Sequence, residues 1–118
     1  MGLTIAEGNL FVATFEGKFT AVEIAILWEC LAGGVGVGLI DFSAVTEFLD
    51  AREIQFALMR AKPIPPSRLA FVCRDDLAFG TVRQLVSVSN LNADYNVFRH
   101  RESAVAWLDL SDRPPVAA

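Results

Sequence analysis

Two neighbouring stretches of sequence decide the fold: Gly38-Leu-Ile-Asp-Phe42 and, after a short interval, Asp50-Ala-Arg-Glu53. The first is a short apolar run bounded by turn residues, which predicts a buried central strand that ends at Asp41 to Ser43. The second is a capping box, because Asp50 can accept from the backbone of Glu53 while Glu53 reaches back to the backbone of Asp50. A buried strand followed by a capped helix is the repeating unit of an α/β fold.

The same alternation extends in both directions along the chain. A strand is expected at 9–15, ending at the break Glu16-Gly17-Lys18, and Leu3 to Ala6 would pair with it as a hairpin. Further strands are expected at 68–73 and 95–99, with helices from Thr20 to Gly33, from Asp50, from Leu77 to about Leu91 and from Glu102 to Leu108. Crossover connections between strands favour a mainly parallel central sheet of about four or five strands, with about four helices and an N-terminal hairpin at one edge.

Length and composition set the outer bounds. The chain has 118 residues, which predicts one domain over residues 1–110 and a flexible C-terminal tail over 111–118. Although 53% of the residues are hydrophobic, the uncharged run Cys30 to Ile40 is much shorter than the roughly 20 residues of a membrane span. We therefore expect no transmembrane segment.

Charge and cysteine usage limit the partners and the compartment. Ten basic and fourteen acidic residues give a net charge of -4, and no segment concentrates lysine and arginine, so a nucleic-acid partner is not expected. Cys30 and Cys73 lie in apolar segments and are interpreted as small buried hydrophobic residues in a reducing compartment. With no secretory signal at Met1 to Glu7, the expected location is the cytoplasm.

Three parts of the chain together resemble the SpoIIAA-like proteins. They are Leu39-Ile-Asp-Phe-Ser-Ala-Val-Thr46, Asp76-Leu-Ala-Phe-Gly80 with Arg83, and Val97-Phe-Arg followed by Ala104-Val-Ala-Trp-Leu108. SpoIIAA-like proteins belong to the STAS group of sulfate-transporter and anti-sigma-factor-antagonist domains and are linked to Sec14-like lipid-binding domains. The resemblance implies a compact four-helix α/β fold used for binding, often in a homodimer.

The chain departs from the anti-sigma antagonists at one important position. In those proteins a phosphorylatable serine begins the helix after the central strand, and its phosphate blocks partner docking. The matching stretch here reads Phe48-Leu-Asp-Ala-Arg52, and neither Asp50 nor Ala51 carries a hydroxyl. We therefore expect no phosphorylation switch there; Ser43 and Thr46 are the nearest hydroxyls, and turn hydrogen bonding explains both.

The candidate residues for catalysis, metal binding or phosphate binding also have plain structural interpretations. The glycine-rich segment Gly33 to Gly38 follows a helix and precedes a strand, the reverse of a phosphate loop, so it is interpreted as a helix terminator. His100 has no Ser, Cys or carboxylate at a local spacing that would make it a catalytic base, and it is interpreted as a solvated helix cap. Arg74-Asp75-Asp76 could bind Mg²⁺ together with Asp41, although capping and an exposed turn also explain these residues. No catalytic residue, metal site or cofactor is predicted.

Three functional hypotheses remain. The favoured one is a non-catalytic protein-interaction or regulatory module, with a homodimer expected. Its interface would use outward apolar residues on the first two helices: Val22, Ile26, Phe56 and Met59.

The alternative is a binder of a small apolar or lipid-like acidic ligand, and an uncharacterised enzyme comes last. A ligand would bind at the C-terminal ends of the central strands, where helix N-termini converge in parallel sheets. The side chains expected at that edge are Ser43, Thr46, Arg74 and Asp75, with Phe48 and Phe79 as an apolar approach.

Overall fold

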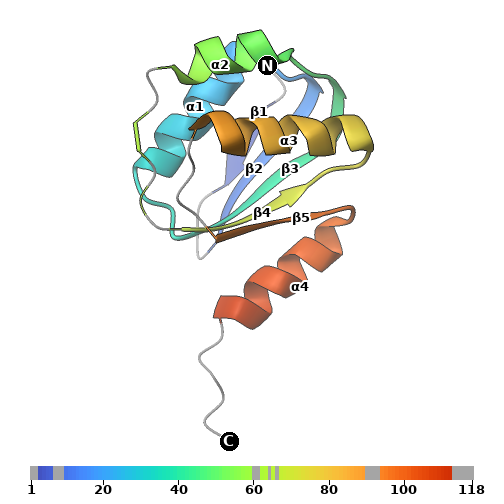
Figure 1. The fold of residues 1–118 in the computed structure, drawn as a ribbon. Coiled ribbons are helices and arrows are strands. Elements are labelled where there is room, and N and C mark those ends of the chain that lie inside the picture. Colours follow the sequence, from blue (N-terminus) through green and yellow to red (C-terminus); the bar gives the residue numbers. More distant parts are fainter. Residues whose placement is uncertain are drawn as a thin grey trace, which may run out of the picture.

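The computed structural model describes residues 3–6, 10–59, 62–63, 65, 67–89 and 94–112 (Figure 1). Strands and helices alternate after an initial pair of strands, as the sequence predicts. In chain order the elements are β1 (Leu3–Ala6), β2 (Phe11–Lys18), α1 (Ala21–Ala32), β3 (Val37–Glu47), α2 (Ala51–Leu58), β4 (Arg68–Val72), α3 (Asp76–Ser89), β5 (Asp94–Phe98) and α4 (Arg101–Asp112).

The described strands form one five-stranded sheet in the order β1-β2-β3-β4-β5. β1 pairs with β2 antiparallel, while β2, β3, β4 and β5 pair in parallel. The predicted mainly parallel sheet with an N-terminal hairpin at one edge is therefore confirmed. Since the strands follow one another in space as they do in sequence, the carboxyl ends of β4 and β5 lie side by side, next to Asp41 within β3.

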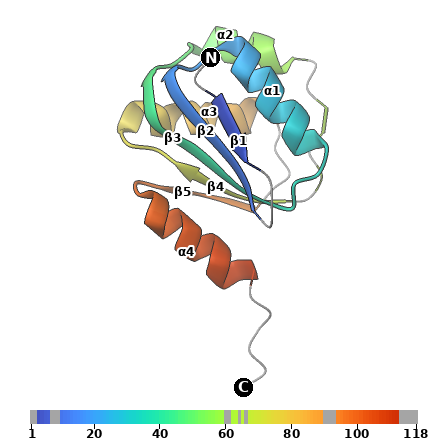
Figure 2. The same ribbon diagram turned by 180° about the vertical axis from the view of Figure 1, so that it is seen from behind.

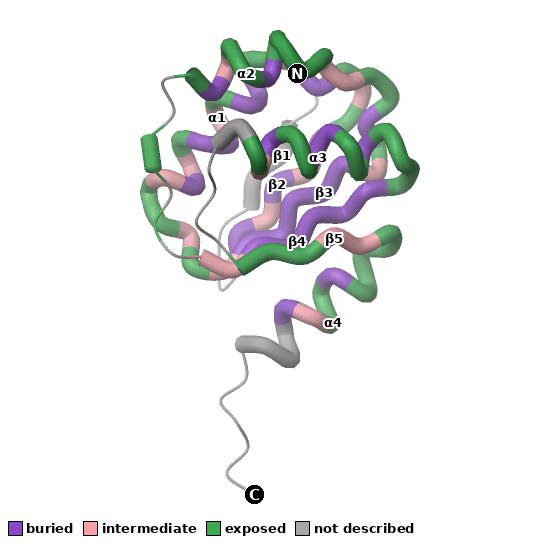
Figure 3. The backbone as a smooth tube through the Cα atoms, in the orientation of Figure 1, coloured by how far each residue is buried: buried purple, intermediate pink, exposed green. Residues whose placement is uncertain are grey.

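The helices cover the two faces of the sheet unequally. Figures 1 and 2 show α1, α2 and α3 on one side of the sheet and α4 on the other. The larger core joins α1, α2 and α3 to side chains such as Phe15, Ile40 and Phe71, whereas the smaller core joins Ala104 and Leu108 of α4 to Leu39, Ala70 and Val72. Buried residues concentrate on the inner strands, and β5 is largely exposed (Figure 3).

The predicted capping boxes form at both helices. The Thr20 backbone N–H donates to Glu23 Oε1 at 3.0 Å and the Glu23 N–H donates to Thr20 Oγ1 at 3.3 Å. At α2 the Asp50 N–H donates to Glu53 Oε1 at 3.2 Å and the Glu53 N–H donates to Asp50 Oδ1 at 2.9 Å. Asp50 is therefore explained by capping, as the sequence predicts.

The ends of β2 and β3 correct two sequence predictions. We expected β2 to break at Glu16-Gly17-Lys18 and β3 to end at Asp41 to Ser43. Instead β2 continues to Lys18, because register shifts after Thr14 and after Gly17 let it stay paired with a β3 that runs to Glu47. Gly17 has a φ of 69°, a left-handed value that suits glycine at such an irregularity. Ser43 and Thr46 consequently lie in a strand and not in a turn.

The other described boundaries agree with expectation to within one residue, except at the C-terminus; the expected strand start at Asn9 and the expected helix end at about Leu91 lie outside the described residues. α1 ends at Ala32, and Gly33 and Gly34 form the turn that follows, with a φ of 88° at Gly34, so this segment is a helix terminator as predicted. α4 extends to Asp112, so the tail expected from residue 111 is helical at its start; residues 113–118 lie outside the described residues. Among the described helices, none is long and apolar enough to cross a membrane.

Candidate functional site

The carboxyl ends of β4 and β5, together with the neighbouring Asp41 to Ser43 of β3, form the edge where the sequence predicts a ligand. Asp41 of β3 pairs with Val72 of β4, and Val72 pairs with Phe98 of β5. The residues just beyond this row meet at the same edge: Ser43, Cys73, Arg74, Asp75, Arg99 and Arg101. We call this set of residues the strand-end edge.

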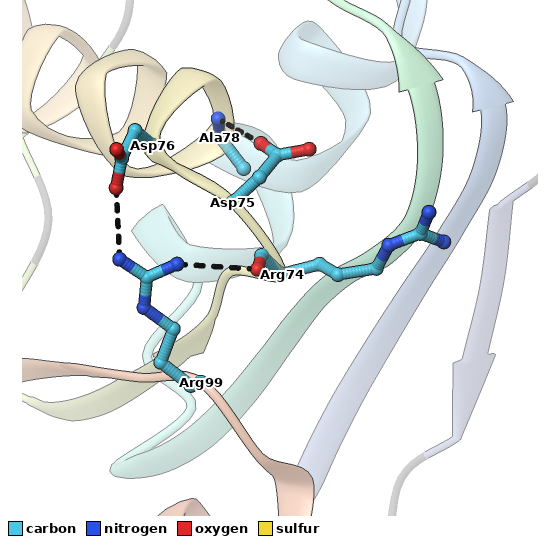
Figure 4. A network of polar contacts seen from close by, with 5 residues as sticks. All are labelled: Arg74, Asp75, Asp76, Ala78 and Arg99. Carbon is cyan, nitrogen blue, oxygen red and sulfur yellow. Dashed lines mark hydrogen bonds and ion pairs between the residues drawn. The ribbon is translucent and has the colours of Figure 1, made fainter.

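An exposed polar network occupies part of the strand-end edge (Figure 4). Arg99 donates to Asp76 Oδ1 at 2.8 Å and to the backbone carbonyl of Arg74 at 3.3 Å, and Asp75 accepts from the Ala78 N–H at 2.9 Å. Asp75 therefore caps α3, as the sequence anticipates. The Arg99–Asp76 pair contributes little stability, because both side chains are largely exposed.

A second ion pair ties α4 to the central strand. Asp41 projects toward α4, and its side chain is only 5% exposed. One carboxylate oxygen accepts from Arg101 Nη1 at 3.2 Å, and the other accepts from the Ser43 N–H at 2.8 Å. Sequence reasoning placed Asp41 at this edge but missed Arg101, because sixty positions separate the two residues.

The arrangement does not favour the Mg²⁺ site considered from sequence. Asp41 is engaged by Arg101 and Ser43, and Asp75 is engaged by the backbone of α3. Across the described part of the chain, no group of three or more His, Cys, Asp or Glu side chains is positioned to hold a metal ion. His100 is exposed, and its carbonyl accepts from the Ala104 N–H at 3.2 Å, which fits a residue capping α4.

The predicted site residues do not all meet. Ser43, Arg74 and Asp75 share the strand-end edge, and Thr46 lies exposed further along β3. Arg74 is exposed, and in Figure 4 its side chain extends away from the Arg99–Asp76 pair. Among the described residues, the Arg74 guanidinium makes no ion pair or hydrogen bond.

The two phenylalanines predicted to line an apolar approach lie apart. Phe48 packs edge-on against Phe19 and Phe42, with ring centroids 6.3 Å apart in each case, so it closes the rim of the main core. Phe79 lies in a hollow of about 580 Å³ between α3 and β5, which Arg83, Tyr95, Asn96 and Val97 complete. We call this hollow the α3–β5 groove. The sequence predicts Phe79 at an apolar approach, but it does not predict that Phe79 and Arg83 meet Tyr95 and Val97 of β5.

Three of the four apolar residues predicted to face outward on α1 and α2 line one hollow: Val22, Phe56 and Met59. A shallow hollow of about 650 Å³ lies between the two helices, lined by Ala21, Val22, Ala25, Phe56, Ala57 and Met59. We call this set the α1–α2 surface. Val22, Phe56 and Met59 are 58%, 76% and 65% exposed, which is high for large apolar side chains. Ile26 is half-buried and does not line the hollow.

The α1–α2 surface has a polar flank. Arg52 and Gln55 line an adjoining hollow that shares Phe56 and Met59 with the first. Arg52, Phe56 and Met59 follow each other at helical spacing, so they project from one side of α2. The exposed face of α2 is therefore apolar at its centre and cationic at one end.

Comparison with solved structures identifies the class of fold. The chain resembles an uncharacterized DUF3478-family protein with a SpoIIAA-like fold from Shewanella loihica, at a TM-score of 0.53 and 20% identity over 90% of this chain and 91% of the other. It also resembles an anti-sigma factor antagonist from Mycobacterium paratuberculosis, at a TM-score of 0.53 and 10% identity over 91% and 92% of the two chains. The protein has a SpoIIAA-like fold, as its sequence resemblance implies.

The comparisons with sequences give no closer assignment. No protein-family model matches the chain, and no curated protein matches it significantly. The structural likeness therefore establishes the fold, and function has to be argued from the surfaces of this chain.

The protonation of the Cys73 thiol decides whether this residue can act as a nucleophile at the strand-end edge. The pKa of the Cys73 thiol is raised from 9.0 to about 12: burial is the largest cause, Asp75 and Asp41 contribute to the increase, and Arg99 opposes it. The thiolate is the reactive form of cysteine, so the folded protein keeps this side chain protonated and unreactive near neutral pH.

We predict that Cys73 resists alkylation in the folded protein. In a Cys30→Ser variant, iodoacetamide at pH 8 should react with Cys73 at least about a hundredfold more slowly under native conditions than in urea. Native reactivity should climb steadily as the pH approaches 12, where the folded thiol ionises. Intact-mass spectrometry at timed intervals measures both rates, and equal rates at pH 8 would contradict the protonated state.

Proposed function

We propose that the protein is a non-catalytic interaction module that associates through its α1–α2 surface. The observation that carries the proposal is the exposure of Val22, Phe56 and Met59 around one apolar hollow. Soluble monomers seldom keep large apolar side chains contiguous in water, and such patches commonly mark protein interfaces. One structural neighbour is an anti-sigma factor antagonist, a name that describes an effect on another protein.

The occupant we propose for the α1–α2 surface is a second copy of the chain. A two-fold interface places the same patch on both partners, so Phe56 of each copy would fill the hollow between α1 and α2 of the other. Phe56 is the most exposed large apolar side chain described, and aromatic residues in central pockets contribute strongly to association.

We further propose that residues 1–110 act as one such module in the cytoplasm. Both cysteines are present as thiols, which suits a reducing compartment. The net charge of -4, spread without a basic cluster, argues for a protein partner over nucleic acid.

Replacing Phe56 with aspartate should weaken self-association. Burying a carboxylate in the apolar hollow is costly, so the dimer dissociation constant should rise by at least about tenfold. Sedimentation velocity at micromolar concentration measures the change. Leu77→Asp is the matched control: Leu77 is 63% exposed in the first turn of α3, outside the α1–α2 surface. A wild-type monomer, or equal loss of the dimer in both variants, would contradict the proposed interface.

The module should operate without a phosphorylation switch at the start of α2. Asp50 caps this helix as a permanent carboxylate, and Ala51 has no hydroxyl. Incubation with a serine kinase of the anti-sigma type and ATP should leave the intact mass unchanged. The Asp50→Ser variant keeps a capping side chain and supplies a hydroxyl, so it is the positive control. Stoichiometric phosphate on Ser43 or Thr46 of the wild type would refute this prediction.

A second candidate function is the binding of an acidic amphiphile at the strand-end edge. The observation in its favour is Arg74, an exposed guanidinium that makes no ion pair among the described residues. Such a group suits a phosphate or carboxylate headgroup. Because the Arg74 guanidinium makes no ion pair among the described residues, removing it should change the stability of the fold little.

Under this second function Arg74→Ala should weaken binding of dodecyl phosphate about tenfold and leave the melting temperature nearly unchanged. Isothermal titration calorimetry and thermal unfolding supply the two readouts. Arg99→Ala is the comparison variant, because Arg99 is engaged by Asp76 and the Arg74 carbonyl. Equal binding by wild type and Arg74→Ala would remove the strand-end edge as a ligand site.

A further inference from the structure

A further candidate site lies at the opposite side of the molecule from the β1–β2 hairpin. β5 is the last strand of the sheet, and in the described residues it pairs with β4 alone. Figure 1 shows β5 running along the sheet edge below α3. The α3–β5 groove defined above lies between these two elements.

The hydrogen bonds of β5 show which of its backbone groups are turned outward. The Asp94 N–H donates to the Ser67 carbonyl at 2.9 Å, and the Phe98 carbonyl accepts from the Cys73 N–H at 2.8 Å, so these residues face β4. The backbone N–H and C=O groups of successive residues in a strand point to opposite sides. Those of Tyr95 and Val97 therefore point away from β4, toward the open edge of the sheet. In agreement, the Val97 N–H donates to the side-chain oxygen of its neighbour Asn96 at 2.8 Å and not to a strand.

The side chains of the same two residues form the floor of the groove. The Tyr95 ring packs edge-on against Phe71 at 6.1 Å, and Val97 packs against the main core, so both project to the side that carries α3. Phe79 and Arg83 stand four apart on α3 and form the opposite wall. Phe79 and Tyr95 are each 39% exposed, which leaves aromatic surface in reach of a ligand.

An edge strand of this kind lacks the usual protection against pairing. Natural edges are blunted by lysine, proline or a bulge, and Asp94–Phe98 contains no lysine or proline and pairs with β4 without a register shift. Its one charged side chain, Asp94, is already held by Arg68. An edge strand beside a helix is the geometry in which domains accept an extended peptide as an added strand.

The charge on the groove decides between possible occupants. Arg83 is exposed and makes no ion pair among the described residues, so the groove carries an unneutralised cation. A second copy's β5 would offer Arg83 no free carboxylate, because the one charged side chain of that strand, Asp94, is held by Arg68. An acidic strand instead neutralises Arg83.

We propose that the edge of β5 binds an extended acidic peptide segment of another protein, whose backbone pairs with Tyr95 and Val97 and whose carboxylate meets Arg83. An apolar side chain two residues from that carboxylate would contact Phe79, because alternate residues of a strand share a face. The Asn96 side chain caps the edge in the absence of peptide and is displaced from the Val97 N–H on binding. This site is independent of the α1–α2 surface.

The first test uses a synthetic peptide of about six residues, the length of a typical strand. Threonine occupies every second position, and valine and glutamate occupy the positions between. Fluorescence anisotropy with the full chain should show that replacing the glutamate of the peptide with lysine weakens peptide binding about tenfold or more. Arg83→Glu should reverse this preference. Arg52→Glu, which changes an exposed arginine on α2 in the same way, should leave it unaltered.

The second test separates backbone pairing from a purely ionic contact. N-methylation removes amide donors, so methylating the alternate amides that face β5 should abolish binding, whereas methylating the other set should not. Amide exchange should show Tyr95 and Val97 protected only when peptide is present.

Three results would overturn the proposal: absence of binding at millimolar peptide, an unchanged charge preference in Arg83→Glu, or equal binding by the two methylated peptides. Protection of Tyr95 and Val97 that rises with protein concentration alone would show that a second copy occupies the edge. Loss of the dimer in the Phe56→Asp variant tests the α1–α2 surface only, and peptide binding at β5 should be the same in that variant.

Discussion

Phe42 of the central strand packs against four other aromatic rings, and the arrangement of the larger core depends on it. Its ring centroid lies 5.3 Å from Phe15 of β2, 4.9 Å from Phe19 before α1, 6.3 Å from Phe48 before α2 and 6.4 Å from Phe71 of β4. One side chain thus fixes the neighbouring strands and the entry points of two helices. The N-cap of α1, Thr20, follows Phe19 directly, and the N-cap of α2, Asp50, lies two residues after Phe48. The local helix signals and the aromatic cluster therefore place the two helices consistently.

The other face of the central strand is held by a smaller set of contacts. Leu39 packs under α4, while the buried carboxylate of Asp41 receives Arg101 from the first turn of that helix. Leaving the buried Asp41 carboxylate without its cation would cost free energy, although the ion pair itself adds little net stability. Its main effect is therefore to fix the position at which α4 starts. The surfaces that the proposals use lie away from these two cores: the outer sides of α1 and α2, the strand-end edge, and the free edge of β5.

Much of the fold could be predicted from sequence because its signals are local. The two capping boxes, the alternation near Phe15 and the glycines after Ala32 each act within a few residues. The ends of β2 and β3 could not be predicted, since Gly17 and Ser43 have turn-like character that strand pairing overrides. Contacts between distant positions were equally hidden: Arg101 with Asp41, the core position of Phe48, and the meeting of Phe79 with Tyr95. Outward apolar residues on α1 and α2 were predicted because helical spacing assigns faces directly, and only Ile26 is less exposed than expected.

We propose that this protein acts through an apolar contact between two copies of the chain and not by enclosing a small ligand. The hollow between α1 and α2 is shallow and lined by Val22, Phe56 and Met59, which suits a complementary protein surface. Native mass spectrometry of freshly purified protein reports assembly and retained small molecules in one spectrum. The account predicts a dimer at twice the chain mass of 12.9 kDa with no added mass. A monomer, or a species that carries a lipid-sized adduct until the protein is denatured, would contradict it.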